Sequence, residues 1–199
     1  MITGILLAAG ESKRFGGNKL LFEIEDLPLV CHNLGHCVAS RLTEIHVVVG
    51  VDGSELEDQI ARHFGGEPRI RIDRNEDPSR GMMSSLKTGL RSVLGRCDGA
   101  MVIHADMPLV TAAIINELIS VFEREQTLVI PESGGRLQHP RIIPERMIGD
   151  FLDLADDEKG TKVIKKYQDR DDVVRVSIGT DANYVDIDIP DDLDVFKRL

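Results

Sequence analysis

The sequence predicts an α/β fold, a Rossmann-like three-layer sandwich around a mostly parallel sheet. Several short apolar runs show no polar alternation, which is typical of strands that are buried on both faces. Segments with helical periodicity lie between these runs, and such alternation requires crossover connections that favour parallel pairing. The predicted strands are Ile2–Ala8, Glu44–Val49, Ala100–His104 and Thr127–Ile130.

The predicted helices alternate with these strands. Leu29 and Leu34 recur at helical spacing behind Pro28, a residue that fits a first helical turn. After Pro131 the pattern is looser, and a short helix is expected to end at Leu199. The expected helices are Pro28–Val38, Ser54–Phe64, Met83–Leu94, Thr111–Phe122, Glu145–Leu154 and Thr161–Tyr167, with further strands at Val173–Ser177 and Tyr184–Ile187.

The length and composition predict one domain, 1–199, with a nucleotide-binding half at about 1–110 and an acceptor-binding half at about 111–199. The three cysteines are expected to be reduced, buried thiols. No apolar run is long enough for a bilayer, and no signal peptide is recognisable, so we expect a cytoplasmic protein without a membrane partner. The net charge of −10 argues against nonspecific binding to nucleic acid.

The segment from Gly10 to Lys19 is predicted to bind phosphates. Its small residues allow backbone N–H groups to approach a phosphate chain, while Arg14 and Lys19 supply positive charge. The loop is neither a Walker A motif nor a dinucleotide-binding G-x-G-x-x-G motif. The alternative is a glycine-rich turn with solvated basic residues.

Five ordered blocks of the sequence are informative together. They are Leu7-Ala8-Ala9-Gly10 with Arg14 and Lys19-Leu20-Leu21; Asn75 with Gly81-Met82-Met83-Ser84-Ser85-Leu86; Ala105-Asp106-Met107-Pro108-Leu109-Val110; Gly135-Arg136-Leu137-Gln138-His139-Pro140; and Asp186-Ile187-Asp188-Ile189-Pro190-Asp191-Asp192-Leu193. In order and approximate spacing these blocks resemble those of the MobA-like nucleotidyltransferases that build molybdenum cofactors. The resemblance covers nearly the whole chain.

The resemblance implies a nucleotide site and a preferred nucleotide. Ala9 is similar to the cytidylyltransferase branch, whereas the guanylyltransferase branch has glycine at this position. A methyl group here narrows the space beside the base, so CTP is expected to be preferred over GTP, with ATP or another NTP still open. The nucleotide-binding residues are expected to be Leu7, Ala8, Ala9, Gly10, Arg14, Lys19, Asn75, Gly81 and Ser85.

Asp106 is the predicted catalytic metal ligand. It follows a buried strand, at the edge of the sheet where open α/β folds bind ligands, and a carboxylate there can hold Mg²⁺ against phosphates. The alternative is a helix-capping role. The resemblance implies a second ligand, Asp188 or Asp186, for which a solvated acidic chain end is the alternative. Arg14, Lys19 and Asp106 are therefore the predicted catalytic residues.

His139 and Arg136 are the predicted acceptor-binding residues, because the resemblance places their block beside the acceptor. This chain has Leu137-Gln138 where the family usually shows glycine before the histidine. His104 is expected to pack or form hydrogen bonds. A zinc site at Cys31-His32-Asn33-Leu34-Gly35-His36-Cys37 is rejected, because on a helix the two cysteines point about 120° apart.

The resemblance implies transfer of CMP from CTP to the terminal phosphate of molybdopterin or its molybdenum-loaded form, with Mg²⁺ as cofactor. The partners expected are CTP or another NTP, a phosphorylated pterin and a molybdoenzyme or its chaperone. An ionised phosphate acceptor requires no dedicated general base, which agrees with the lack of an obvious triad. The alternatives are a guanylyltransferase, a sugar- or alditol-phosphate nucleotidyltransferase, and a noncatalytic NTP-binding delivery module.

Overall fold

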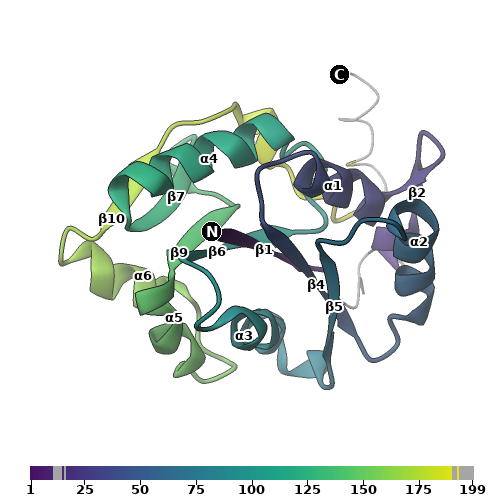
Figure 1. The fold of residues 1–199 in the computed structure, drawn as a ribbon, viewed down its shortest axis with the longest axis horizontal. Coiled ribbons are helices and arrows are strands. Elements are labelled where there is room, and N and C mark those ends of the chain that lie inside the picture. Colours follow the sequence, from purple (N-terminus) through teal and green to yellow (C-terminus); the bar gives the residue numbers. More distant parts are fainter. Residues whose placement is uncertain (11–14, 16, 190–191, 193–199) are drawn as a thin grey trace.

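The computed structural model describes residues 1–10, 15, 17–189 and 192, and it has the predicted three-layer α/β architecture (Figure 1). The main sheet contains β1 (Ile2–Leu7), β4 (Glu44–Gly50), β5 (Ile70–Asn75), β6 (Gly99–His104), β7 (Leu128–Ser133), β8 (Arg136–Leu137), β9 (Arg141–Pro144) and β10 (Val173–Val176). The strand order is β10-β7-β9-β6-β1-β4-β5, and β8 pairs with β7. The pairs β1–β4, β1–β6, β4–β5 and β7–β10 are parallel, whereas β9 is antiparallel to β6 and β7.

Helices cover both faces of this sheet (Figure 1). One hydrophobic core joins the sheet to α1 (Leu29–Val38), α2 (Ser54–Phe64) and α4 (Ala112–Glu125). A second core joins it to α3 (Met82–Val93), α5 (Glu145–Leu152) and α6 (Thr161–Gln168). The adjacent residues Ile5 and Leu6 of β1 are fully buried in different cores, which explains why this strand is a continuous apolar run.

The remaining elements are short. A separate hairpin pairs β2 (Glu23–Ile24) with β3 (Leu27–Pro28). Short 3-10 helices span Lys19–Leu21, Pro78–Arg80 and Asp181–Tyr184. The sheet strands β5, β8 and β9 were not predicted, because β5 lies at the sheet edge and carries charged residues at alternate positions, while β8 and β9 are too short to form a clear apolar run.

The prediction of a strand at Tyr184–Ile187 is wrong. Tyr184 ends the 3-10 helix that begins at Asp181, and the next residues form no strand. A capping box between Thr180 and Asn183 starts this helix, and the Tyr184 hydroxyl donates to the Ile178 carbonyl. These local hydrogen bonds compete with strand pairing. The helix predicted to end at Leu199 falls outside the described residues, apart from Asp192.

The cysteines are buried free thiols, as expected. Cys31 and Cys37 belong to the core beneath α1, and His32 of the same helix lies with its Nε2 atom 2.8 Å from the Ile24 carbonyl oxygen. Within the described part of the chain, no helix has both the length and the apolar character needed to cross a bilayer.

Candidate functional site

The carboxyl ends of β1 and β6 hold the candidate site. These parallel strands place Leu7 opposite His104, and the Ala105 N–H donates to the Leu7 carbonyl over 3.1 Å. The buried Asn33 of α1 donates from Nδ2 to the carbonyls of His104, at 2.9 Å, and Met107, at 2.8 Å. These bonds hold the backbone on both sides of Asp106 at the sheet edge.

Lys19 and the C-terminal aspartates meet at Asp106. The Lys19 Nζ atom lies 2.7 Å from Asp106 Oδ2 and 3.0 Å from Asp188 Oδ1. The Ile187 N–H donates to the Asp106 carbonyl over 2.9 Å, which fixes the segment that carries Asp188 beside the sheet. Residues from three distant parts of the chain therefore form one charged centre. Arg14, the other basic residue predicted for it, lies outside the described residues.

A cavity of about 390 Å³ opens beside this centre. Six of the residues predicted for nucleotide binding or catalysis line it, namely Leu7, Ala9, Gly10, Gly81, Ser85 and Asp106; the other lining residues are Pro78, Ser79, Met82 and His104. Ala8 is instead buried, and its N–H donates to the Val48 carbonyl. After the predicted role of these six residues, we name it the nucleotide cavity.

Asn75 supports the nucleotide cavity from outside. Its side chain is 5% exposed, and Nδ2 donates to the hydroxyls of Ser84 and Ser85, both at 2.9 Å. These serines lie in the first turn of α3, which follows Gly81. Gly81 has a φ of +98°, a conformation that side chains disfavour, and it lets the chain turn sharply into the helix. The first turn of α3 thus faces the cavity, and helix N-termini favour anions.

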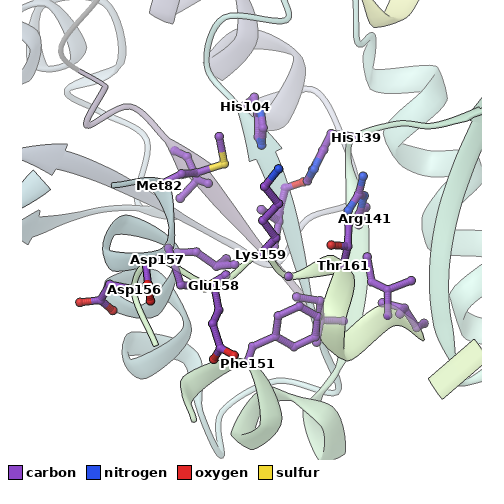
Figure 2. A pocket seen from close by; sticks show the side chains of 18 residues that line it. Met82, His104, His139, Arg141, Phe151, Asp156, Asp157, Glu158, Lys159 and Thr161 are labelled. Carbon is purple, nitrogen blue, oxygen red and sulfur yellow. The ribbon is translucent and has the colours of Figure 1, made fainter. Parts of the chain in front are cut away.

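A second cavity, of about 400 Å³, adjoins the first. Figure 2 shows the side chains that line this second cavity. Both cavities are lined by Leu7, Met82 and His104. The second one is mainly apolar, with walls from Met83, Leu86, Val102, Leu128, Ile143, Phe151 and Ile164. Its charged lining residues are the basic Arg141 and Lys159 and the acidic Asp156, Asp157 and Glu158. We name it the acceptor cavity, because His139, a predicted acceptor-binding residue, lines it.

Two histidines are stacked where the cavities adjoin. The His104 and His139 ring centroids are 4.1 Å apart, with an interplanar angle of 30°. Burial lowers the pKa of His104 and lowers the pKa of His139 well below its usual value. Both rings are therefore neutral at pH 7.

The two predicted acceptor residues differ in position. His139 lines the acceptor cavity, whereas Arg136 is exposed on β8 and lines neither cavity. Arg141 lines the acceptor cavity instead, and its Nε donates to the Gln138 carbonyl over 2.8 Å. Burial lowers the pKa of Arg141 to about 10, so it stays charged at neutral pH. No sequence signal marks Arg141, because an arginine at the start of so short a strand resembles an exposed residue.

Residues 4–172 match the MobA-like NTP transferase domain. The chain belongs to the MobA-like NTP transferase family. Residues from four of the five blocks that resemble this family line the two adjoining cavities, for example Gly10, Gly81, Asp106 and His139.

Relatives of this MobA-like transferase differ in the nucleotide that their names specify. It is 31% identical to a probable molybdenum cofactor guanylyltransferase of Pyrococcus horikoshii, over 67% of the chain and 64% of the relative. It is 28% identical to a 2-C-methyl-D-erythritol 4-phosphate cytidylyltransferase of Dictyoglomus thermophilum, over 59% of the chain and 50% of the relative. The matches thus span less than two thirds of either relative's length. A crystal structure from Mycobacterium sp. strain JC1, of a homologue of a Mycobacterium tuberculosis protein, has a TM-score of 0.83 and 25% identity, covering 100% of this chain and 98% of the other.

The MobA-like chain has a donor set that fits a divalent cation. One ligand atom each from His104, Asp106 and Asp186 lies within 4.8 Å of the others. Asp106 Oδ1 and His104 Nε2 are buried without a hydrogen-bond partner among the described residues. Buried polar atoms normally have a partner, and a cation would supply one. Asp186 groups with Asp106 here, whereas Asp188 contacts Lys19, so the geometry favours Asp186 of the two predicted second ligands.

Replacing Asp186 with asparagine is expected to stabilise the metal-free transferase above pH 6. Burial, and then the charges of Asp106 and Asp188, raise the pKa of Asp186 from 3.8 to about 6. The folded state therefore binds this proton more tightly than the unfolded state, so the carboxyl destabilises the fold progressively as pH rises from about 4 to 6. Because Asp186 is partly exposed, screening keeps the effect below about 1 kcal/mol.

Thermal unfolding in a metal chelator, at pH 4 and pH 8, measures this effect. The Tm difference between Asp186→Asn and wild type should be positive at pH 8 and close to zero at pH 4. Equal Tm differences at both pH values would contradict the raised pKa of Asp186 and the destabilisation that follows from it.

A buried lysine joins α3 to a segment that lines the acceptor cavity, and sequence reasoning missed it. Lys87 of α3 is 7% exposed, and its Nζ donates to the Leu154 carbonyl and to Asp156 Oδ1, the latter at 2.9 Å. Arg80 pairs with the other oxygen of Asp156. Hydrogen bonding from Lys87 lowers the pKa of Asp156. α3 thus holds the 153–160 segment, part of which lines the acceptor cavity.

Replacing Lys87 with methionine is expected to raise KM for the acceptor more than KM for the NTP. The substitution releases the 153–160 segment, while Asn75 still holds the start of α3. Asp156 keeps its ion pair with Arg80 but loses the one with Lys87, and the Leu154 carbonyl loses its hydrogen-bond donor. We therefore expect the free energy of unfolding to fall by about 1–3 kcal/mol. Steady-state kinetics with each substrate varied, and urea unfolding, measure the two effects.

Lys162→Met is the matched control, because Lys162 is 67% exposed and forms a single pair with Glu158. It should change stability by less than about 0.5 kcal/mol. If both variants changed the two KM values alike, Lys87 would have no special link to the acceptor cavity.

Proposed function

We propose that this transferase moves CMP from CTP to the terminal phosphate of a phosphorylated pterin, molybdopterin or its molybdenum-loaded form, and releases pyrophosphate. One observation carries the proposal: the nucleotide and acceptor cavities share Leu7, Met82 and His104, beside the Lys19–Asp106 pair. An NTP in one cavity and a phosphate monoester in the other would meet at these shared residues.

The reaction forms a bond from an acceptor phosphate oxygen to the α-phosphorus of CTP and breaks the bond to the β-phosphate. The acceptor monoester is already largely ionised at neutral pH, so it attacks without a general base. Lys19, together with Arg14, neutralises the triphosphate, and the α3 N-terminus at Gly81 orients it. Mg²⁺, held by Asp106 and Asp186 when bound, would supply further charge for the phosphates.

The chemistry of the acceptor cavity supports a flat, mostly apolar acceptor that carries an anion. Phe151, Met82 and the stacked histidines offer surfaces for a conjugated ring. The polar residues Asp156, Asp157, Glu158 and Thr161 line another part of the cavity. Figure 2 shows the Lys159 side chain extending toward His104 and His139. Lys159 and Arg141 therefore supply charge for the acceptor phosphate.

The preference for CTP rests on Ala9, which lines the nucleotide cavity. Its methyl group reduces the space beside the base, and one such group discriminates by about 1–3 kcal/mol, or 10–200-fold. Ala9→Gly should therefore move the ratio of kcat/KM for CTP over GTP toward GTP by at least tenfold. The variant itself tests this explanation, because it removes a single methyl group.

Incubation of the protein with each labelled NTP, molybdopterin and Mg²⁺ tests the proposed reaction. CMP transfer with pyrophosphate release supports it, and release with GTP alone would assign the chain to the guanylyl branch. Tight NTP binding by calorimetry without transfer to any acceptor would favour the NTP-binding module that delivers a cofactor to a molybdoenzyme or its chaperone. Transfer only to a sugar or alditol phosphate would replace the pterin as acceptor.

A further inference from the structure

We propose that His104 is a nitrogen ligand of the divalent cation, together with Asp106 and Asp186, and that this ligand makes the site bind Mn²⁺ more tightly than Mg²⁺. The proposal rests on the nucleotidyltransferase reaction proposed above, but its test measures the metal ligands directly.

The positions of the three groups carry the proposal. Their ligand atoms lie within 4.8 Å of one another. Two ligands about 2.1 Å from one ion are about 3 Å apart when adjacent and about 4.2 Å apart when opposite, so small side-chain rotations bring all three onto one cation. His104 and Asp106 extend from the same strand end, and Ile187 fixes the third group by its bond to the Asp106 backbone.

The unpaired atoms support the same assignment. His104 Nε2 and Asp106 Oδ1 are both buried, and neither has a hydrogen-bond partner among the described residues. The other Asp106 oxygen is occupied by Lys19, which also neutralises Asp188. Stacking on His139 limits the rotation of the His104 ring, and Asn33 holds its backbone carbonyl. The ring is therefore held beside the carboxylates at the junction of the two cavities.

The mixed donor set predicts the choice of metal. Carboxylates and water suit Mg²⁺, whereas an imidazole favours transition metals, and Mn²⁺ accepts both kinds of ligand. Mg²⁺ can still support turnover through Asp106 and Asp186. His104 then determines how much more tightly Mn²⁺ binds.

Electron spin echo spectroscopy of Mn²⁺ bound to the whole protein tests this proposal, with and without a nonhydrolysable CTP analogue. Wild type should show ¹⁴N modulation from a directly bound nitrogen, and ¹⁵N-histidine labelling should change it. His104→Gln should lose this modulation and bind Mn²⁺ about 10–100-fold more weakly, with a smaller change for Mg²⁺. His139→Phe, which keeps an aromatic ring against His104, is the matched control and should retain the modulation.

Two results would overturn the proposal: Mn²⁺ bound without ¹⁴N modulation in wild type, or modulation that persists in His104→Gln. If His104→Gln fails to fold, ¹⁵N-histidine labelling of wild type and of His139→Phe still decides the question. A label-dependent modulation that persists in His139→Phe shows that a histidine other than His139 binds the metal. Nucleotidyl transfer without nitrogen coordination would refute only the metal proposal. Nitrogen coordination without transfer to any acceptor would refute only the proposed function.

Discussion

Asp106→Asn is expected to lower kcat/KM by about 10³-fold, or ~4 kcal/mol, which is the largest effect of any single substitution in this site. The carboxylate pairs with Lys19 over 2.7 Å, lines the nucleotide cavity and belongs to the three-residue donor set that fits a divalent cation. Asparagine keeps the size but removes the charge that both the lysine and a divalent cation need. Pyrophosphate release at saturating Mg²⁺, measured over a range of CTP concentrations, gives the loss in kcat/KM.

The same substitution should change stability little. Lys19 keeps its 3.0 Å contact with Asp188, and Asp186 loses a repulsive neighbour, so the two effects on folding oppose each other. Asp150→Asn is the matched control, because Asp150 also pairs with a lysine, Lys166, but lines neither cavity. It should leave kcat/KM within about twofold of wild type. A fall of less than tenfold for Asp106→Asn would remove this carboxylate from the catalytic role.

The central fold was predictable because its strands are buried on both faces. Continuous apolar sequences such as Ile2–Leu7 and Gly99–His104 have no other common explanation when helices alternate with them. The edge strand Ile70–Asn75 was missed because one side pairs with no other strand and charged side chains interrupt the apolar pattern. The order of strands, which includes the antiparallel Arg141–Pro144, depends on tertiary pairing that local patterns do not encode.

The candidate site was predictable where position along a strand determines position in space. Asp106 follows β6 and Gly10 follows β1, and parallel neighbours bring these ends together. Lys87 and Arg141 were missed because neither differs in sequence from an exposed residue. Lys87 lies within an amphipathic helix and Arg141 begins a strand, and both positions usually carry solvated side chains. Asn75 was predicted to bind the nucleotide, yet its hydrogen bonds to Ser84 and Ser85 give it a supporting position that spacing alone does not reveal.

Lys19→Met is expected to lower kcat/KM by about 10²–10³-fold, because it removes the cation that contacts both Asp106 and Asp188 and is proposed to neutralise the triphosphate. Methionine preserves most of the aliphatic packing of a side chain that is 12% exposed. The substitution also leaves the carboxylates of Asp106, Asp186 and Asp188 without this neighbouring cation. We therefore expect the free energy of unfolding to fall by about 1–3 kcal/mol at pH 7, a smaller effect than the loss of activity. Steady-state pyrophosphate release and urea unfolding measure the two quantities.

The Lys19→Met/Asp106→Asn double variant shows whether these residues act as one unit. If each side chain contributes only when the other is present, the double variant should lose little more activity than the more damaging single variant. Lys19→Arg keeps the charge and should recover most of the stability, but its broad, planar guanidinium cannot reproduce the compact contact with both aspartates, so activity should recover less. Additive losses in the double variant would mean that Lys19 and Asp106 act on separate parts of the reaction. The contact between the two side chains would then serve only to position them in the nucleotide-free protein.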